Sequence, residues 1–406
     1  MAADTPFSEL TTLKVGGPIS RLVTATTQRD LVDLAVEAWD DREPWLVLGG
    51  GSNLLVGDDG FDGTVIRVAT KGIEVLPPRD LPPNAVDAPA SGTTRIRVQA
   101  GEDWDAFVAW TIEHGFAGIE ALSGIPGSVG AAPVQNIGAY GQELESTLVA
   151  VEFLEEGADV PRRMTAADLE LGYRTSVLKR GLRGVVVSVE LELHDTAAER
   201  EVLGEALGQP IAYGQLADAL HVNLGDRVPI ARVREAVLAL RASKGMVLDP
   251  TDPDSVSAGS FFTNPIVPER VARSLPGDAP RWYLEEDAPD EVVPIAAGVL
   301  DESPLDQFLA HQASLGASGA ATDAPPAEPL VKLSAAWLIE HSGIRRGFTL
   351  PGSRAAVSSK HTLALTNRGG ATAEDVAQLA RFVQSRVHAE FGIMLHPEPV
   401  LVGVEL

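Results

Sequence analysis

Hydrophobic and polar positions alternate along the first part of the chain in a pattern that predicts both strands and helices. Apolar residues recur at every second position in 148–154 and 185–193, which predicts two strands. Thr27, followed three positions later by Asp30, predicts a capping box at the start of a helix that runs to Trp39. The other elements predicted here are strands at 19–26, 45–48, 64–68 and 95–99 and a helix at 103–114. This mixture predicts an α+β domain over residues 1–225.

The rest of the chain is predicted to be a separate region. Helices are predicted at 228–241 and 332–341, and a strand at 362–366. The clearest helix begins after Thr372 and ends at Gly392. Its apolar stripe has helical spacing and is interpreted as core: Val376, Leu379, Ala380, Val383, Val387 and Phe391. Two segments without periodicity, at about 77–94 and 276–329, are interpreted as insertions.

Two glycine-rich segments carry the first functional signal. Residues 123–141 contain five glycines and two prolines but no charged residue, and Gly49-Gly50-Gly51-Ser52-Asn53 follows the predicted strand 45–48. Uncharged, glycine-rich backbone is suited to lie against a planar cofactor or a pyrophosphate. A Rossmann turn is excluded, because Leu54 stands at the third glycine position and a loop, not a helix, is expected to follow. A tight structural turn remains the alternative for residues 49–53.

Composition narrows the class of protein. The chain has 57 acidic and 32 basic residues, a formal net charge of −25, so neither nucleic acid nor an anionic membrane is expected as a partner. It has no cysteine, and its eight histidines show no metal-binding spacing, so no disulfide, thiolate chemistry or metal site is predicted. No signal peptide is recognised, and no apolar run approaches the roughly 18 residues needed to cross a bilayer. We therefore expect a cytoplasmic protein.

Several short motifs contain candidate reactive residues. Arg174 lies in Gly-Tyr-Arg-Thr-Ser, Ser260 in Ala-Gly-Ser-Phe-Phe-Thr-Asn-Pro, and Glu398 between two prolines. Tyr213 precedes a glycine, and Lys244 follows the helix predicted at 228–241. Each residue alone has a plainer interpretation as a surface ion pair, a turn hydroxyl or a solvated side chain.

The order of these motifs resembles that of the UDP-N-acetylenolpyruvoylglucosamine reductase family, in the form with a tyrosine-bearing substrate loop. The resemblance extends from about Gly16 to Val402, apart from the two insertions. It implies an α+β fold with an FAD-binding domain of the vanillyl-alcohol-oxidase-like type at 1–225, made of two α+β subdomains that divide near 69–70. A smaller α/β substrate-binding domain at 226–406, with a long insertion at about 276–329, is implied to follow.

The resemblance also implies an activity and residue roles. Such an enzyme holds FAD non-covalently and uses NADPH to reduce the enolpyruvyl group of UDP-N-acetylglucosamine enolpyruvate to the lactyl ether, for peptidoglycan synthesis. Ser260 matches the proton donor, Arg174 and Glu398 the residues beside the enolpyruvyl group, and Tyr213, Lys244 and Asn264 residues near the UDP-sugar. The matching FAD-binding residues are Gly49, Gly50, Gly51, Ser52, Asn53, Gly127, Ser128, Gly130, Asn136, Ile137, Gly138, Ala139 and Tyr140.

The sequence departs from the family pattern at a few positions. Ala131 and Ala132 stand where some members have serines, so hydrogen bonds to the flavin there would have to come from backbone. Val400 stands where some members have arginine, so a cofactor contact is not carried over to that position. An alternative is another FAD-dependent oxidoreductase of the same fold that oxidises a sugar or an alcohol, although a proton donor at Ser260 argues against it. A protein that keeps the fold without cofactor is a further alternative. No obligate protein partner is inferred.

Overall fold

The computed structural model describes residues 5–77, 92–284 and 328–406. These divide into a larger unit, 1–263 with 339–406, and a smaller unit, 264–338. The predicted domain boundary at 225/226 does not coincide with this division and stays a prediction. Most of the predicted insertions at 77–94 and 276–329 lies outside the described residues.

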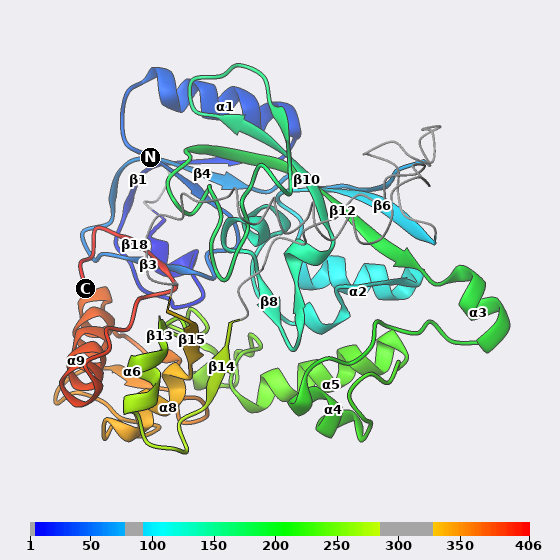
Figure 1. Ribbon diagram of the computed structural model, residues 1–406. Helices are drawn as coiled ribbons and strands as arrows, with labels where there is room; N and C mark the ends of the chain where they lie inside the picture. Colours follow the sequence, from blue (N-terminus) through cyan, green and yellow to red (C-terminus); the bar gives the residue numbers. More distant parts are fainter. Residues whose placement is uncertain (1–4, 78–91, 285–327) are drawn as a thin grey trace, which may run out of the picture. The chain divides into compact units, whose positions relative to one another are not determined.

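The larger unit begins with a parallel sheet covered by a helix. Its strand order is β1-β4-β2, and α1 packs on β1 and β4 (Figure 1). Thr27 caps α1 through the predicted capping box with Asp30. A second parallel pair joins β3 to β18, which brings the residues after the Gly49–Asn53 turn beside the end of the chain. The bounds are β1 (Ile19–Ala25), β2 (Trp45–Leu48), β3 (Leu54–Val56), β4 (Phe61–Val68), β18 (Val400–Val402) and α1 (Gln28–Asp40).

A six-stranded sheet forms the centre of the larger unit. Its strands follow the order β11-β10-β12-β6-β5 with antiparallel pairing, and β7 pairs with the end of β12. The strands predicted at 148–154 and 185–193 are confirmed as β10 and β12, although burial does not alternate along them: β12 is buried on both faces from Val185 to Leu191. The bounds are β5 (Ile73–Val75), β6 (Thr93–Gln99), β7 (Phe116–Ala117), β10 (Leu148–Glu155), β11 (Arg162–Thr165) and β12 (Gly184–Asp195).

Between α2 and β10 the chain runs through the long glycine segment. The regular parts of the stretch between these two elements include three 3-10 helices, over Glu120–Leu122, Val129–Gln135 and Leu144–Ser146, and the hairpin β8–β9. The helices of the larger unit also include α5, which contacts the first of these 3-10 helices, and α9, which packs on β16 and β17. The bounds are α2 (Trp104–His114), β8 (Gly138–Ala139), β9 (Gln142–Glu143), α3 (Ala197–Leu203), α4 (Gly214–Leu220), α5 (Ile230–Ser243), β16 (Ala355–Val357), β17 (Leu365–Asn367) and α9 (Ala373–Phe391).

The predicted C-terminal helix is confirmed in α9. Thr372 caps it in a capping box with Asp375, and Gly392 ends it at a φ of +68°. Its predicted apolar stripe is buried except for Phe391, which is partly buried.

The smaller unit contains a three-stranded antiparallel sheet in the order β13-β15-β14. The helix predicted at 332–341 is wrong at its start, because Lys332 pairs within β15 and α8 begins only at Ala335. Successive side chains on a strand face opposite ways, and Val331 and Leu333 are buried while Lys332 is only partly covered. The bounds are β13 (Ile266–Pro268), α6 (Glu269–Ser274), β14 (Arg281–Tyr283), β15 (Leu330–Leu333) and α8 (Ala335–His341), whose last residues belong to the larger unit.

Candidate active site

The two glycine segments meet and line a cavity of about 230 Å³, here named the glycine cradle. A Cβ atom on Gly50 would lie only 2.7 Å from the Cα of Gly127, so neither segment has room for a side chain where they meet. Gly127 has a φ of +131°, a conformation that other residues rarely adopt. The cradle is lined by Leu46, Val47, Gly49–Leu54, Trp104, Ile125–Ser128, Ala131, Ala132, Val134, Gln135, Ile137 and Val400, none of them charged.

The strand that enters the first segment explains how the cradle is shaped. β2 ends at Leu48, and the chain then turns sharply at Gly51, whose φ is +61°. The hydroxyl group of Ser52 donates to the carbonyl of Pro126 at 2.8 Å, and Asn53 donates to the side-chain oxygen of Gln135 at 2.6 Å. The expectation of a loop after Asn53 is wrong in one detail, because Leu54–Val56 forms β3; the absence of a helix there agrees with the rejected Rossmann turn.

The other predicted cofactor residues fall into different places. Gly130 does not line the cradle, and a Cβ at this position would lie only 2.5 Å from the Cβ of Ala100. Asn136 is buried, and its side chain bonds to Glu145 and to the carbonyl of Gly172, which ties the glycine segment to the Arg174 motif. Ile137 lines the cradle, and Gly138 lines the cavity beside it. Ala139 and Tyr140 line neither of these two cavities.

A second cavity, of about 120 Å³, adjoins the cradle and is here named the charged cavity. It brings together the three predicted catalytic residues, Ser260, Arg174 and Glu398. It shares part of its wall with the cradle, since both are lined by Ser52, Asn53, Ile125, Pro126, Gln135 and Ile137. A group bound in the cradle would therefore be next to a group bound among the three catalytic candidates.

The guanidinium group of Arg174 is held from several sides. Its two terminal nitrogens donate to the carbonyl oxygens of Asn136 at 3.3 Å and Gly138 at 2.7 Å, and its Nε lies 3.2 Å from Glu398. Arg174 has a φ of +54°, which is uncommon for a residue with a side chain. Since an arginine has five N–H donors, these contacts leave donors for a further acceptor. The arrangement presents a fixed positive fork to the charged cavity.

Glu398 lies opposite Arg174 in a largely enclosed position, with its side chain 14% exposed. Burial raises the pKa of the Glu398 carboxyl above its ordinary value, while the positive charges of Arg174 and Lys179 act in the opposite direction. The backbone N–H of Glu398 donates to the carbonyl of Phe261 at 2.9 Å, so Glu398 is tied to the turn that contains Ser260. Nothing in the sequence pattern placed these two motifs side by side.

Comparison with known proteins agrees with this geometry. Residues 19–160 match the model of an FAD binding domain, and residues 250–402 match that of the UDP-N-acetylenolpyruvoylglucosamine reductase C-terminal domain. A protein of that name from Leifsonia xyli subsp. xyli (strain CTCB07) is 58% identical over 404 residues, which cover 98% of each chain. The chain belongs to the UDP-N-acetylenolpyruvoylglucosamine reductase family.

More distant members agree over the same length. The reductase of Mycobacterium tuberculosis (strain ATCC 25177 / H37Ra) is 40% identical over 415 residues, which cover 100% of this chain and 96% of that protein. The crystal structure of the reductase from Thermus caldophilus superposes with a TM-score of 0.56 at 25% identity and covers 98% of this chain and 97% of the other. The predicted fold class, an FAD-binding α+β domain followed by a C-terminal domain, is confirmed.

Two charged residues of the site were missed in the sequence analysis. Arg241 lies at the end of α5 and lines the charged cavity; it is 9% exposed, and its Nε atom has no hydrogen-bond partner among the described residues. Burial lowers the pKa of Arg241. Lys179 lies five positions after Arg174 and donates to the backbone carbonyl of Glu398 at 3.2 Å. The only hint of Arg241 in the sequence is its position three residues before the candidate Lys244.

The predicted substrate residues outside the charged cavity lie near one another or in the other unit. The rings of Tyr213 and Tyr140 meet edge to face with centroids 5.8 Å apart, and the Nζ of Lys244 lies 5.2 Å from the centroid of the Tyr140 ring. Lys244 also donates to Gln215 at 2.8 Å. Asn264 belongs to the smaller unit, where its side chain accepts from the backbone N–H of Ala335 at 3.0 Å.

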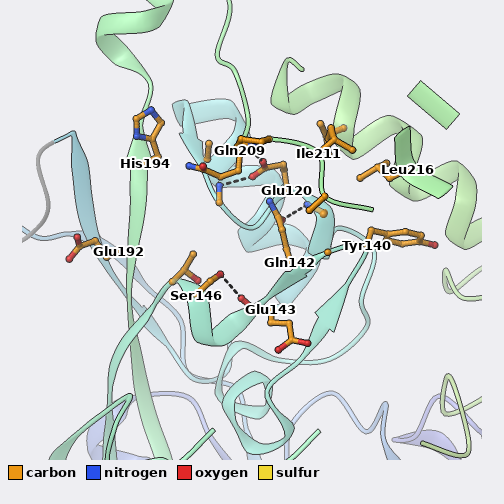
Figure 2. A pocket seen from close by; sticks show the side chains of 18 of the residues that line it. Glu120, Tyr140, Gln142, Glu143, Ser146, Glu192, His194, Gln209, Ile211 and Leu216 are labelled. Atoms are coloured by element: carbon orange, nitrogen blue, oxygen red, sulfur yellow. Dashed lines mark hydrogen bonds between the residues drawn. The ribbon is translucent and has the colours of Figure 1, made fainter. Parts of the chain in front are cut away.

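A larger cleft, of about 810 Å³, lies beside the β8–β9 hairpin (Figure 2). Of the predicted site residues, all of which the structure describes, only Tyr140 lines it. The carboxylate of Glu120 accepts from the backbone N–H groups of Gly118 and Gln209, and that of Glu192 accepts from Thr93 and Arg95. Because none of the three predicted catalytic residues lines it, the cleft is not the candidate active site despite its size.

Proposed function

We propose that this protein is an FAD-dependent reductase that uses NADPH to convert the enolpyruvyl group of UDP-N-acetylglucosamine enolpyruvate to the lactyl ether. The product is UDP-N-acetylmuramate, a precursor of peptidoglycan. The observation that carries the proposal is the shared wall of the glycine cradle and the charged cavity. It is supported by the 58% identity to a reductase of that name. We infer that the reaction takes place in the cytoplasm; none of the described helices is long and apolar enough to span a membrane.

The cradle suits FAD because it offers close backbone and no charge. A Cβ at Gly50 or Gly127 would enter space that the opposing segment or a bound group needs. Backbone N–H groups at the Gly49–Asn53 turn are suited to the pyrophosphate, and Ile125, Ile137 and Trp104 offer apolar surface to the ring system. When bound, FAD supplies the hydride that NADPH delivers to it.

Arg174 and Arg241 are the groups proposed to hold the acid group of the substrate. Reduction of the enolpyruvyl double bond places negative charge on the carbon next to the carboxylate, and the charge spreads into that carboxylate. The fork of Arg174 is fixed before the substrate arrives, so its contribution requires little rearrangement during the reaction. The free Nε of Arg241 offers a second donor in the same cavity.

Ser260 is proposed to deliver the proton that completes the reduction. A serine hydroxyl is a weak acid, so it can act only on a strongly basic carbon that is held at a fixed position. The buried Phe261 and Phe262 anchor the turn, and Phe261 accepts from the N–H of Glu398. Glu398 is proposed to orient the intermediate or to relay the proton to Ser260.

Two half-reactions test the proposal separately. The purified protein is expected to show the two visible absorption bands of bound flavin, which NADPH bleaches and the enolpyruvyl UDP-sugar restores. A colourless protein would contradict the FAD site. Flavin that NADPH reduces but only oxygen reoxidises would contradict the assigned substrate.

A further inference from the structure

Lys179 has partners that give it a place in the site, although it does not line the charged cavity. Its Nζ donates to the backbone carbonyl of Glu398 at 3.2 Å, and the same carbonyl accepts from Asn53 at 3.3 Å. The N–H of Glu398 donates to Phe261 at 2.9 Å. The backbone of Glu398 is thereby fixed between a residue of the cradle and the turn that bears Ser260.

The charges around Glu398 come from few directions. Arg174 lies 3.2 Å away on one side, Lys179 contributes a second positive charge, and Arg241 lines the same cavity. The cradle and the Ser260 turn contribute neutral groups. Lys179 is itself half-buried, and burial lowers its pKa, as does Arg174, whereas the negative charge of Glu398 acts to raise it. A buried carboxyl group near two cations has a lower pKa than the same group near one cation.

We propose that Lys179 is a positioning residue of this reductase, which acts through Glu398 by fixing its backbone and by favouring the ionised form of its carboxyl group. Lys179 touches neither substrate nor flavin in this proposal. The inference rests on the role proposed for Glu398 at the charged cavity. It assigns a function to a residue that lies three positions after the Gly-Tyr-Arg-Thr-Ser motif.

The test is the pH dependence of flavin reoxidation by the enolpyruvyl substrate, followed in a single turnover of the holoenzyme. The limb of the profile that disappears in Glu398→Gln reports the ionisation of Glu398. Lys179→Met removes a positive charge and therefore raises the pKa of Glu398, so this limb is expected to move to higher pH by about one unit. Lys179→Arg keeps the charge and is expected to leave the limb near its original position.

Two further variants make the result specific. Lys179→Gln is also neutral but keeps a polar side chain, and the same upward shift is expected in it. It serves as the test if Lys179→Met does not retain flavin. Lys71→Met is the matched control, because Lys71 also donates to a backbone carbonyl, that of Gly101 at 2.7 Å, and pairs with a carboxylate, but lines neither cavity. The control should leave the limb unmoved.

The outcomes separate the inference from the function on which it rests. A limb that is lost in Glu398→Gln but unmoved in both neutral variants of Lys179 overturns the inference alone. Equal loss of rate in the methionine and arginine variants without a shift also overturns it, since that result means a purely structural role. A limb that survives Glu398→Gln contradicts the role of Glu398, and the inference falls with it.

Discussion

The glycine cradle and the charged cavity share part of one wall but are lined by different kinds of chemical group. The cradle is made of backbone and uncharged side chains, and its shape depends on the absence of Cβ atoms at Gly50 and Gly127. The charged cavity is made of side chains that carry charge, chiefly Arg174, Arg241 and Glu398. The protein has a net charge of −25, so two guanidinium groups at one small cavity make that site locally positive in an otherwise negative protein.

This difference indicates which amino-acid substitutions each of the two regions should tolerate. The cradle responds to volume, since one added methyl group meets backbone that cannot move aside. The charged cavity responds to the identity of a side chain, since a change of similar volume can remove a charge or a proton. Variants of the cradle should therefore lose flavin, whereas variants of the cavity should keep flavin and lose part of the reaction.

The largest expected effect follows from Gly51→Ala. The Cβ of an alanine would collide with the carbonyl oxygen of Leu10, and the φ of +61° at this position is itself unfavourable for alanine by about 1 kcal/mol. We expect the purified variant to hold no flavin, which its visible absorption spectrum would show.

The matched control for this prediction is Gly277→Ala. No heavy atom lies within 4 Å of a Cβ at Gly277, and its φ is not in the left-handed region. The control should keep the flavin bands of the parent protein. Full flavin content in Gly51→Ala would show that the turn can open, and the contrast between the two regions would then be weaker than proposed.

The second effect concerns the charged cavity and is expected from Ser260→Ala. Ser260 is proposed to act only on the substrate, so the variant should bind flavin and accept hydride from NADPH at the parental rate. Reoxidation by the enolpyruvyl substrate should slow by about 10²- to 10⁴-fold, the usual contribution of a positioned proton donor. Stopped-flow absorbance at the flavin band measures both half-reactions, and equal slowing of the two would remove Ser260 from its role as proton donor.

The contrast between the regions also explains how much the sequence could predict. The cradle was predictable because its signal is local: Gly49–Asn53 and 123–141 are continuous stretches in which glycine density and missing charge already indicate close backbone. The regular elements with clear periodicity, such as β10, β12 and α9, were predictable for the same reason.

The charged cavity depends on contacts between residues far apart in the chain. The Asn136 side chain ties Gly172, near Arg174, to the glycine segment, and the N–H of Glu398 bonds to Phe261. Arg174 and Glu398 themselves meet at 3.2 Å. No periodicity encodes such pairings, so only resemblance to a family could bring these residues together in advance. Arg241 was missed because an arginine near a helix end is ordinarily solvated, and its burial is a property of the folded chain alone.

The smallest effect is expected from Lys244→Ala, which tests whether a positive charge outside the charged cavity contributes to binding alone. Lys244 lies over the ring of Tyr140 and bonds to Gln215, outside both cavities, and it is proposed to contact the UDP-sugar rather than the reacting carbon. The variant should raise the KM for the UDP-sugar by about tenfold, equivalent to roughly 1.4 kcal/mol, and leave kcat nearly unchanged.

A pH series sharpens this last prediction. Burial lowers the pKa of Lys244, and the positive charge of Arg241 lowers it further, so Lys244 loses its proton at a lower pH than an ordinary lysine, whose pKa is about 10.4. Since the neutral amine no longer attracts a diphosphate, the KM of the parent protein should rise as the pH approaches that lowered value, and Lys244→Ala should lack this rise. A KM that rises equally in both proteins would show that Lys244 is not the source of this pH dependence. A kcat that falls with Lys244→Ala would show that Lys244 contributes to the reaction itself and not only to binding of the UDP-sugar.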